Sequence, residues 1–251
     1  MNKLKFGKGN AKLDSRVQTF SLPAGKTCPG ANECKSMAIE KGGRRTIKDG
    51  PKTVFRCFAA SQEVLYTKTF EARAHNLRLL MEHKHNATKM AGLITASLPG
   101  KTKWVRIHVS GDFFSQTYFN AWLKVARANP DILFYAYTKS LHLWVNLLGF
   151  IPTNLVLTAS VGGKHDLLIH AHNLRYAKVV YSEAEAKDLG LEIDKDDTKA
   201  MKHGPSFALL LHGTQPKGSE AGVAWRKLSK AGKAGYNAKT VKNVSLPVMI
   251  P

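Results

Sequence analysis

From residue 104 onward, short apolar runs alternate with stretches in which apolar residues recur at helical spacing. The runs are rich in β-branched and aromatic residues, and such wholly apolar runs are typical of strands covered on both faces. In the first helical stretch Phe119, Trp122 and Ala126 share one stripe. The pattern predicts strands at 104–109, 132–137, 155–159, 178–181 and 207–211, and helices at 117–128, 141–148, 165–176 and 183–189.

The first hundred residues predict fewer regular elements. Residues 17–22 are a candidate leading strand, and residues 63–83 a long helix with one apolar stripe. Between them lies a loop, residues 23–62, which contains Gly42-Gly43 and Gly50-Pro51 and reads as an irregular insertion. Strands that alternate with helices predict a parallel sheet with crossover helices. The fold class is therefore α/β, with about six parallel strands in a partial (β/α) barrel or an open doubly wound sheet.

The positive charge of the chain lies mainly at its two ends. The formal net charge is +20; residues 1–56 carry thirteen Lys and Arg against four Asp and Glu, and residues 217–251 carry seven against one. Such a distribution attracts polyanions, so nucleic acid or a phosphorylated substrate is an expected partner. We expect one domain over residues 1–226 and a basic segment over 227–251. The glycines of residues 227–236 disfavour a packed helix there.

Composition excludes several classes of protein. With 43% hydrophobic residues the chain can bury a core, so it is not a disordered polybasic tail. No apolar run approaches the roughly 18–20 residues of a membrane span. The first residues lack the apolar stretch of a secretory signal, and three cysteines make no disulfide framework. We therefore expect a soluble, cytoplasmic protein with no membrane partner.

Small, polar and ionisable residues follow every predicted strand. In parallel α/β folds the loops at the carboxyl ends of the strands converge on the face where ligands bind. Turn chemistry explains the glycines among these residues but explains Asp112, Lys139 and His212 less well. We predict an active-site rim, with Lys139 and His212 as candidate catalytic residues and Ser160 and Glu183 as candidate cofactor contacts. The strand ends are Ser110-Gly111-Asp112, Thr138-Lys139-Ser140, Ser160-Val161-Gly162-Gly163, Ser182-Glu183 and His212-Gly213.

All three cysteines, Cys28, Cys34 and Cys57, lie within 30 residues and directly after the leading strand. Free cysteines are often merely buried, but three in one short segment favour a soft-metal site. Three thiolates can hold an iron–sulfur cluster with one iron left open, or a zinc ion completed by a histidine. The lack of a fourth cysteine favours an open coordination position, and both metals stay open at this point.

This arrangement resembles the radical S-adenosylmethionine (radical SAM) enzymes, which fold as partial (β/α) barrels and hold a [4Fe–4S] cluster on three cysteines. In that superfamily an aromatic residue usually lies two positions before the third cysteine, as Phe55 does here. A Gly-Gly-Glu-like turn usually ends its second strand, where this chain has Ser110-Gly111-Asp112. The cysteine spacing departs from the family pattern of three residues and then two, because five and then 22 residues separate the cysteines here.

Residues 18–225 are also similar to a phage-encoded family known by a gene-product label. A phage origin would place the protein in the host cytoplasm, and it implies no activity of its own. The likeness is carried by Leu22-Pro-Ala-Gly-Lys-Thr-Cys-Pro-Gly30, Phe55-Arg-Cys-Phe-Ala-Ala-Ser-Gln-Glu63, His108-Val-Ser-Gly-Asp-Phe-Phe114 and Tyr137-Thr-Lys139.

The radical SAM resemblance implies a set of site residues. The three cysteines would ligate the [4Fe–4S] cluster, and S-adenosylmethionine would be the cofactor. Asp112, with Gly111 beside it, would accept hydrogen bonds from the cofactor's ammonium group, and Phe55 would pack near its adenine. An external electron donor would reduce the cluster. The basic charge and the phage likeness, rather than this resemblance, suggest nucleic acid or a nucleotide as the substrate.

Two other interpretations remain. The first is a zinc-stabilised, basic nucleic-acid-binding protein without catalysis. The second is a metal-free barrel enzyme that binds phosphate at Gly162-Gly163. Separately, the acidic cluster of Asp194, Asp196 and Asp197 lacks the glycine and glutamate of a calcium-binding loop. It predicts a solvated loop.

Overall fold

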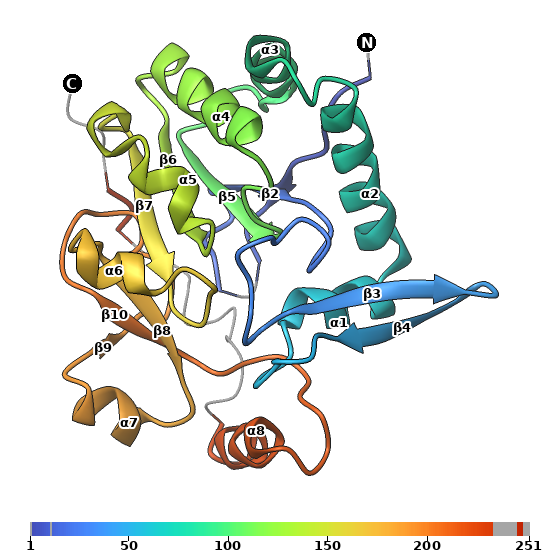
Figure 1. Cartoon of the computed structure of the whole chain (residues 1–251), viewed down its shortest axis with the longest axis vertical. Helices are drawn as coiled ribbons and strands as arrows, with labels where there is room; N and C mark the ends of the chain where they lie inside the picture. Colours follow the sequence, from blue (N-terminus) through green and yellow to red (C-terminus); the bar gives the residue numbers. More distant parts are fainter. Residues whose placement is uncertain (1, 11, 233–244, 248–251) are drawn as a thin grey trace.

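One mostly parallel sheet of eight strands organises the chain (Figure 1). The computed structural model describes residues 2–10, 12–232 and 245–247. Every neighbouring pair is parallel except the first, in which β1 runs antiparallel to β2. Across the sheet the strands are β1 (Gly7–Lys8), β2 (Gln18–Ser21), β5 (Trp104–Ser110), β6 (Leu133–Thr138), β7 (Leu155–Ser160), β8 (Tyr176–Val180), β10 (Phe207–Leu210) and β9 (Glu192–Ile193).

From β2 to β8, neighbouring strands of the sheet follow one another in chain order, as in a (β/α) barrel and unlike the central reversal of a doubly wound sheet. The order reverses only at the far edge, where β10 pairs with β8 and β9, which precedes β10 in the chain, lies outside it. Within the described residues the edge strands β1 and β9 do not pair with each other, so the barrel is not closed. The predicted parallel α/β sheet is confirmed. It has eight strands in place of about six, because β1 and β9 are two residues each and leave no apolar run.

Helices α2 to α6 pack their apolar residues on one face of the sheet. In α4, Trp122 is fully buried and contacts the ring of Phe134 on β6 edge-on at 6.1 Å. Ser115 caps this helix by accepting a hydrogen bond from the Tyr118 amide. The helices are α1 (Phe58–Leu65), α2 (Thr67–Met81), α3 (Ala87–Ser97), α4 (Gln116–Ala128), α5 (Leu141–Val145), α6 (Leu167–Ala171), α7 (Glu183–Asp188) and α8 (Glu220–Lys230), with a 3-10 turn at Leu148–Phe150.

The other face of the sheet is also covered. Side chains alternate along a strand, so Phe134 of β6 faces the helices while Tyr135 faces the opposite side. There Ala200 and Met201, which precede β10, pack with Leu246 from the C-terminal part of the chain. The covered inner face explains why the strands read as continuous apolar runs.

Three predicted elements are wrong: the helix at 63–83, the irregular insertion within 23–62 and the helix at 165–176. The long helix predicted at 63–83 is two helices, α1 and α2, which meet at the extended residue Tyr66. The irregular insertion is a β-hairpin of β3 (Ser36–Lys41) and β4 (Arg44–Asp49), turned by two glycines of positive φ. The helix predicted at 165–176 is only α6, since Tyr176 already begins β8.

The C-terminal segment is more ordered than the sequence indicates. Helix α8 continues to Lys230 and buries Leu228, so the loose segment predicted from residue 227 is wrong for its first four residues. Residues 233–236 of that prediction lie outside the described residues. Farther on, the Trp104 indole N–H donates a hydrogen bond to the Pro247 carbonyl at 2.8 Å, which ties residues 245–247 to the sheet. Among the described residues no helix is both long and apolar enough to span a membrane.

Candidate metal centre

The three cysteines converge at the carboxyl end of β2. Cys28 and Cys34 lie in the loop that follows this strand, and Cys57 is the N-cap residue of α1. All three thiols are free and half-buried. Burial raises the pKa of Cys28 well above its usual value, and the neighbouring Asp112, Cys57 and Cys34 raise it further. The thiols are therefore close enough to repel one another as thiolates.

The surroundings of Cys57 also indicate that the thiols lie near one another. Burial and the nearby Cys34 raise its pKa to about 11, against the opposite effects of the Ala59 and Ala60 backbone and of Arg73. Cys57 lies at the N-terminus of α1, where backbone N–H groups favour a thiolate. A cationic metal centre would turn the mutual repulsion of the three thiolates into attraction, so the donor set fits a soft metal.

The hairpin β3–β4 closes the wide gap between the second and third cysteines. In its antiparallel register Ser36 pairs with Asp49, so the chain returns to its starting point. The Cys57 amide then donates a hydrogen bond to the Ser36 hydroxyl at 3.4 Å. A spacing of 22 residues is thus compatible with thiols that meet, because most of these residues form the hairpin.

A buried ion pair holds the cysteine loop in place. Glu63 of α1 and Arg73 of α2 pair at 2.9 Å, both almost fully buried. The same Glu63 oxygen accepts hydrogen bonds from the Ala24 amide at 2.8 Å and the Ser110 hydroxyl at 3.4 Å. The pair thus joins the cysteine loop, two helices and the end of β5. The prediction missed Glu63 and Arg73, since a lone acid and a lone base in helices carry no sequence signal.

The loop that carries Cys28 and Cys34 is hydrogen-bonded to the turn after β7. The Lys164 amide donates to the Gly30 carbonyl at 2.8 Å, and the Glu33 amide donates to the Gly162 carbonyl at 3.0 Å. The amides of Gly162 and Gly163 both donate to the Asp166 carboxylate, at 2.7 and 2.9 Å. The N–H groups that the alternative phosphate site would need are therefore already hydrogen-bonded to Asp166.

Gly30 should not tolerate a side chain. A Cβ atom there would overlap the Lys139 backbone carbonyl, so Gly30→Ala must displace the cysteine loop. We expect this variant to lose about 1–3 kcal/mol of unfolding free energy, measured by urea titration, and to retain less metal. Gly92→Ala in α3 is the control. Nothing lies within 4 Å of its Cβ, so it should be neutral or up to about 1 kcal/mol more stable. Equal stabilities of the two variants would contradict this packing.

Asp112 and Lys139 tie the strand ends together. The buried Asp112 carboxylate accepts hydrogen bonds from the Phe113 amide at 2.7 Å, the Thr138 hydroxyl at 2.6 Å and the Lys139 amide at 2.8 Å. The Lys139 ammonium donates to the Ser160 hydroxyl and carbonyl and to the Val161 carbonyl. An ammonium has three donors, and all three serve the fold here. Lys139 is therefore left out of the catalytic set that we propose.

The remaining predicted residues are spread along the rim. Gly111 has a φ of +86°, and a Cβ there would lie 2.6 Å from the Thr27 hydroxyl, so it lets β5 end against the cysteine loop. Phe55 packs in the apolar cluster under α8. The His212 ring packs against Phe58 at a tilt of 40°, with ring centroids 4.6 Å apart. Glu183 is exposed in the first turn of α7. The structure does not test the predicted ligand contacts of these residues or of Ser160, which remain predictions.

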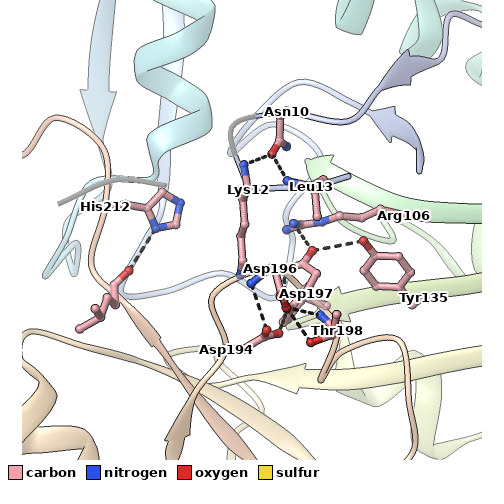
Figure 2. A network of polar contacts seen from close by, with 12 residues as sticks. Asn10, Lys12, Leu13, Arg106, Tyr135, Asp194, Asp196, Asp197, Thr198 and His212 are labelled. Carbon is pink, nitrogen blue, oxygen red and sulfur yellow. Dashed lines mark hydrogen bonds and ion pairs between the residues drawn. The ribbon is translucent and has the colours of Figure 1, made fainter. Parts of the chain in front are cut away.

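A second polar cluster, which we call the Asp197 cluster, fills the inner face of the sheet (Figure 2). Asp197 is fully buried, and its carboxylate pairs with Lys12 at 2.6 Å and with Arg106 at 2.5 Å. It also accepts hydrogen bonds from the hydroxyls of Tyr135 and Tyr137 at 3.3 and 3.1 Å. Asp194 beside it is buried too. The solvated loop predicted for these acids is wrong for Asp194 and Asp197, which are buried beside cations from distant parts of the chain, whereas Asp196 is half-buried and accepts hydrogen bonds from Thr198.

Within the described residues no group of three or more His, Cys, Asp or Glu side chains is arranged to hold a single metal ion. Ligands of one tetrahedral zinc ion must come within about 4 Å of one another, given Zn–S bonds of about 2.3 Å. The thiolates of a [4Fe–4S] cluster bind different irons and lie farther apart. The three free thiols are the donors that either kind of centre would use.

Comparisons with known proteins identify relatives in phages. A family model described as Gene product 88 matches residues 2–234. The Gene 88 protein of Mycobacterium phage L5 is 60% identical over 37 residues, which are 15% of this chain and 16% of that protein. The Gene 88 protein of Mycobacterium phage D29 is 34% identical over 90 residues, 33% of this chain and 38% of that protein. The chain thus spans less than two fifths of either relative. No solved structure matches it.

Proposed function

The chain belongs to the Gene product 88 family, and on that premise we propose that it is an iron–sulfur enzyme with radical-SAM-like chemistry. The observation that carries the proposal is the placement of three free thiols: Cys28 and Cys34 lie in the loop after β2, and the β3–β4 register and the hydrogen bond from the Cys57 amide to Ser36 bring Cys57 back beside that loop. They lie where β2 ends, on the edge at which parallel (β/α) proteins bind ligands. Three thiolates leave one iron of a [4Fe–4S] cluster free to bind a small molecule.

Cys28, Cys34 and Cys57 would hold the cluster. When bound, it would supply one electron to the sulfonium group of S-adenosylmethionine. The chain's own part is to position the ligands and to exclude water, since the chemistry belongs to the cofactor. The Glu63–Arg73 pair holds the cysteine loop against α1 and α2.

Asp112 is the candidate contact for the ammonium group of S-adenosylmethionine. It lies close enough to Cys28 to raise the pKa of that thiol. Its carboxylate accepts three hydrogen bonds, and a carboxylate offers about four acceptor positions. One position remains for the cofactor. A buried carboxylate is the group that a partly desolvated ammonium requires.

The test is cleavage of S-adenosylmethionine by protein that has been purified and reconstituted without oxygen. With dithionite as reductant, we expect methionine and 5′-deoxyadenosine to form at rates that depend on the protein. Cys34→Ala protein treated identically should form neither product above background. Iron-loaded wild-type protein that forms no 5′-deoxyadenosine would contradict the radical chemistry and leave only a cluster-binding protein.

The zinc-stabilised nucleic-acid-binding protein is the second candidate, and the basic β3–β4 hairpin beside the cysteines favours it. It requires a histidine to complete the coordination of one zinc ion by the three thiols. Stoichiometric zinc in protein purified without added metal, with no iron uptake on reconstitution, would select this candidate over the first.

A further inference from the structure

The β3–β4 hairpin has one face that packs on the protein and one that does not. Ile47 faces inward and joins the small apolar cluster of Ala24, Ala59 and Ala60. Arg45, on the same side of β4, hydrogen-bonds the Thr67 hydroxyl and stacks over the Phe70 ring at 5.1 Å. Figure 1 shows the hairpin extending outward past α1 and α2. Its second face therefore points to solvent.

The outward face is basic and carries no carboxylate. It presents Arg44, Thr46 and Lys48 from β4, all exposed, and opposite them Lys41 and Ile39 from β3. The acids of the hairpin lie elsewhere. Glu40 pairs in register with the inward Arg45, and Asp49 forms an ion pair with Arg56 at 2.5 Å. The positive charge of the outward face is therefore not neutralised within the hairpin.

The placement of two of these cations opposes the stability of the hairpin. Lys41 and Arg44 are direct cross-strand partners next to the Gly42-Gly43 turn. Like charges directly opposite each other destabilise an antiparallel pair. Ile39, 39% exposed, lies on the same face. The like-charged pair at the turn opposes folding of the hairpin, so it indicates a partner of opposite charge.

We propose that the outward face of the β3–β4 hairpin binds the phosphate backbone of duplex DNA and holds it beside the cysteines. A two-stranded ribbon fits the major groove of B-form DNA, whereas the major groove of RNA is too narrow for side chains to read. The outward face has no aromatic side chain on which single-stranded bases could stack. Lysine and arginine side chains neutralise phosphates without reading sequence, so the binding is of low specificity.

The hairpin is covalently and physically part of the cysteine site. It begins two residues after Cys34 and ends eight residues before Cys57. At its base the Lys35 ammonium donates a hydrogen bond to the Cys28 carbonyl at 2.7 Å. A duplex on the outward face would lie against the hairpin whose base contacts the cysteine loop. The proposed DNA-binding surface does not depend on the proposed iron–sulfur function. The further role of this DNA as the enzyme's substrate does depend on that function.

The experiment measures binding of a short labelled duplex by fluorescence anisotropy between about 50 and 200 mM salt, with the full chain as purified. The triple variant Lys41→Gln/Arg44→Gln/Lys48→Gln should bind at least about tenfold more weakly near 0.1 M salt. Its plot of log affinity against log salt should be shallower by about 3, one for each lost phosphate contact. The swap Lys41→Arg/Arg44→Lys/Lys48→Arg keeps the charges and should bind as the wild type does.

A matched control separates this surface from net charge. Lys84→Gln/Lys89→Gln/Lys124→Gln removes three exposed lysines near α2, α3 and α4 and should leave the affinity and the salt slope unchanged. Equal losses in both triple variants, or none in either, would overturn the proposal. So would tighter binding to a single strand than to the duplex, or hairpin-dependent binding to polyglutamate but not to DNA. Iron content, measured on the same samples, decides the proposed function separately.

Discussion

Replacement of any one of the three cysteines by alanine should leave colourless protein with little iron. Each thiolate would bind a different iron, so the loss of one opens the cluster to solvent and degradation. Iron and acid-labile sulfide, measured after identical reconstitution without oxygen, should fall at least about fivefold from the wild-type values. Cys28, Cys34 and Cys57 should behave alike, because each thiol lies within the electrostatic reach of another.

Met37→Ala is the control for the cysteine variants. Met37 is a half-buried sulfur-bearing residue in the same segment and should not ligate the cluster, so its loss should leave the iron content unchanged. A cysteine variant that keeps its full iron and sulfide would remove that residue from the site. If all three variants did so, the proposed metal centre would be wrong.

Asp197→Asn should lower the free energy of unfolding by about 3 kcal/mol. The amide preserves the size of the side chain and tolerates the φ of +65° at this position, but it leaves Lys12 and Arg106 without their carboxylate. Removal of one partner from a buried ion pair costs about 3–5 kcal/mol, and the nearby Asp194 keeps the cost at the lower end. Urea titration at neutral pH measures the difference.

The effect of Asp197→Asn should depend on pH. Burial opposes ionisation of Asp197, but Arg106 and Lys12 more than offset it and hold its pKa below the usual value. A lowered folded pKa stabilises the protein above the unfolded pKa of about 3.9, and this stabilisation is lost as the pH falls through the folded value. The difference between wild type and variant should therefore narrow below about pH 4.

The exposed pair Arg78–Glu82 on α2 is the control for Asp197. Glu82→Ala removes a solvent-screened i,i+4 pair and should cost no more than about 0.5 kcal/mol. If Asp197→Asn cost as little, the Asp197 cluster would not contribute to the stability of the inner face.

The sequence predicted the parallel sheet well because its strands are covered on both faces. The strand at 104–109 and the helix at 117–128 match β5 and α4 within one residue at each end, since continuous apolar runs and the stripe around Trp122 leave clear patterns. The hairpin β3–β4 leaves no such pattern, because its outward face is charged and its inward face is only half-buried. Gly42 and Gly43 indicated a turn, but the surrounding sequence indicated an irregular loop and not a hairpin.

Polar contacts between residues far apart in the chain could not be predicted from the sequence. The partners of Asp197 come from positions 12, 106, 135 and 137, and no local spacing connects them. The three cysteines could be proposed as a group because they are rare and close along the chain. The hydrogen bonds from the Lys139 ammonium to the end of β7 could not be predicted either. They depend on the register of β6 against β7, which the sequence does not show.

The Mössbauer spectrum of ⁵⁷Fe-reconstituted wild-type protein tests the metal centre most directly. We predict the signature of a [4Fe–4S] cluster in which about a quarter of the signal, from the one iron without a cysteine, shifts when S-adenosylmethionine is added. A protein that takes up no iron, or that carries one tightly bound zinc ion in its place, would contradict the account.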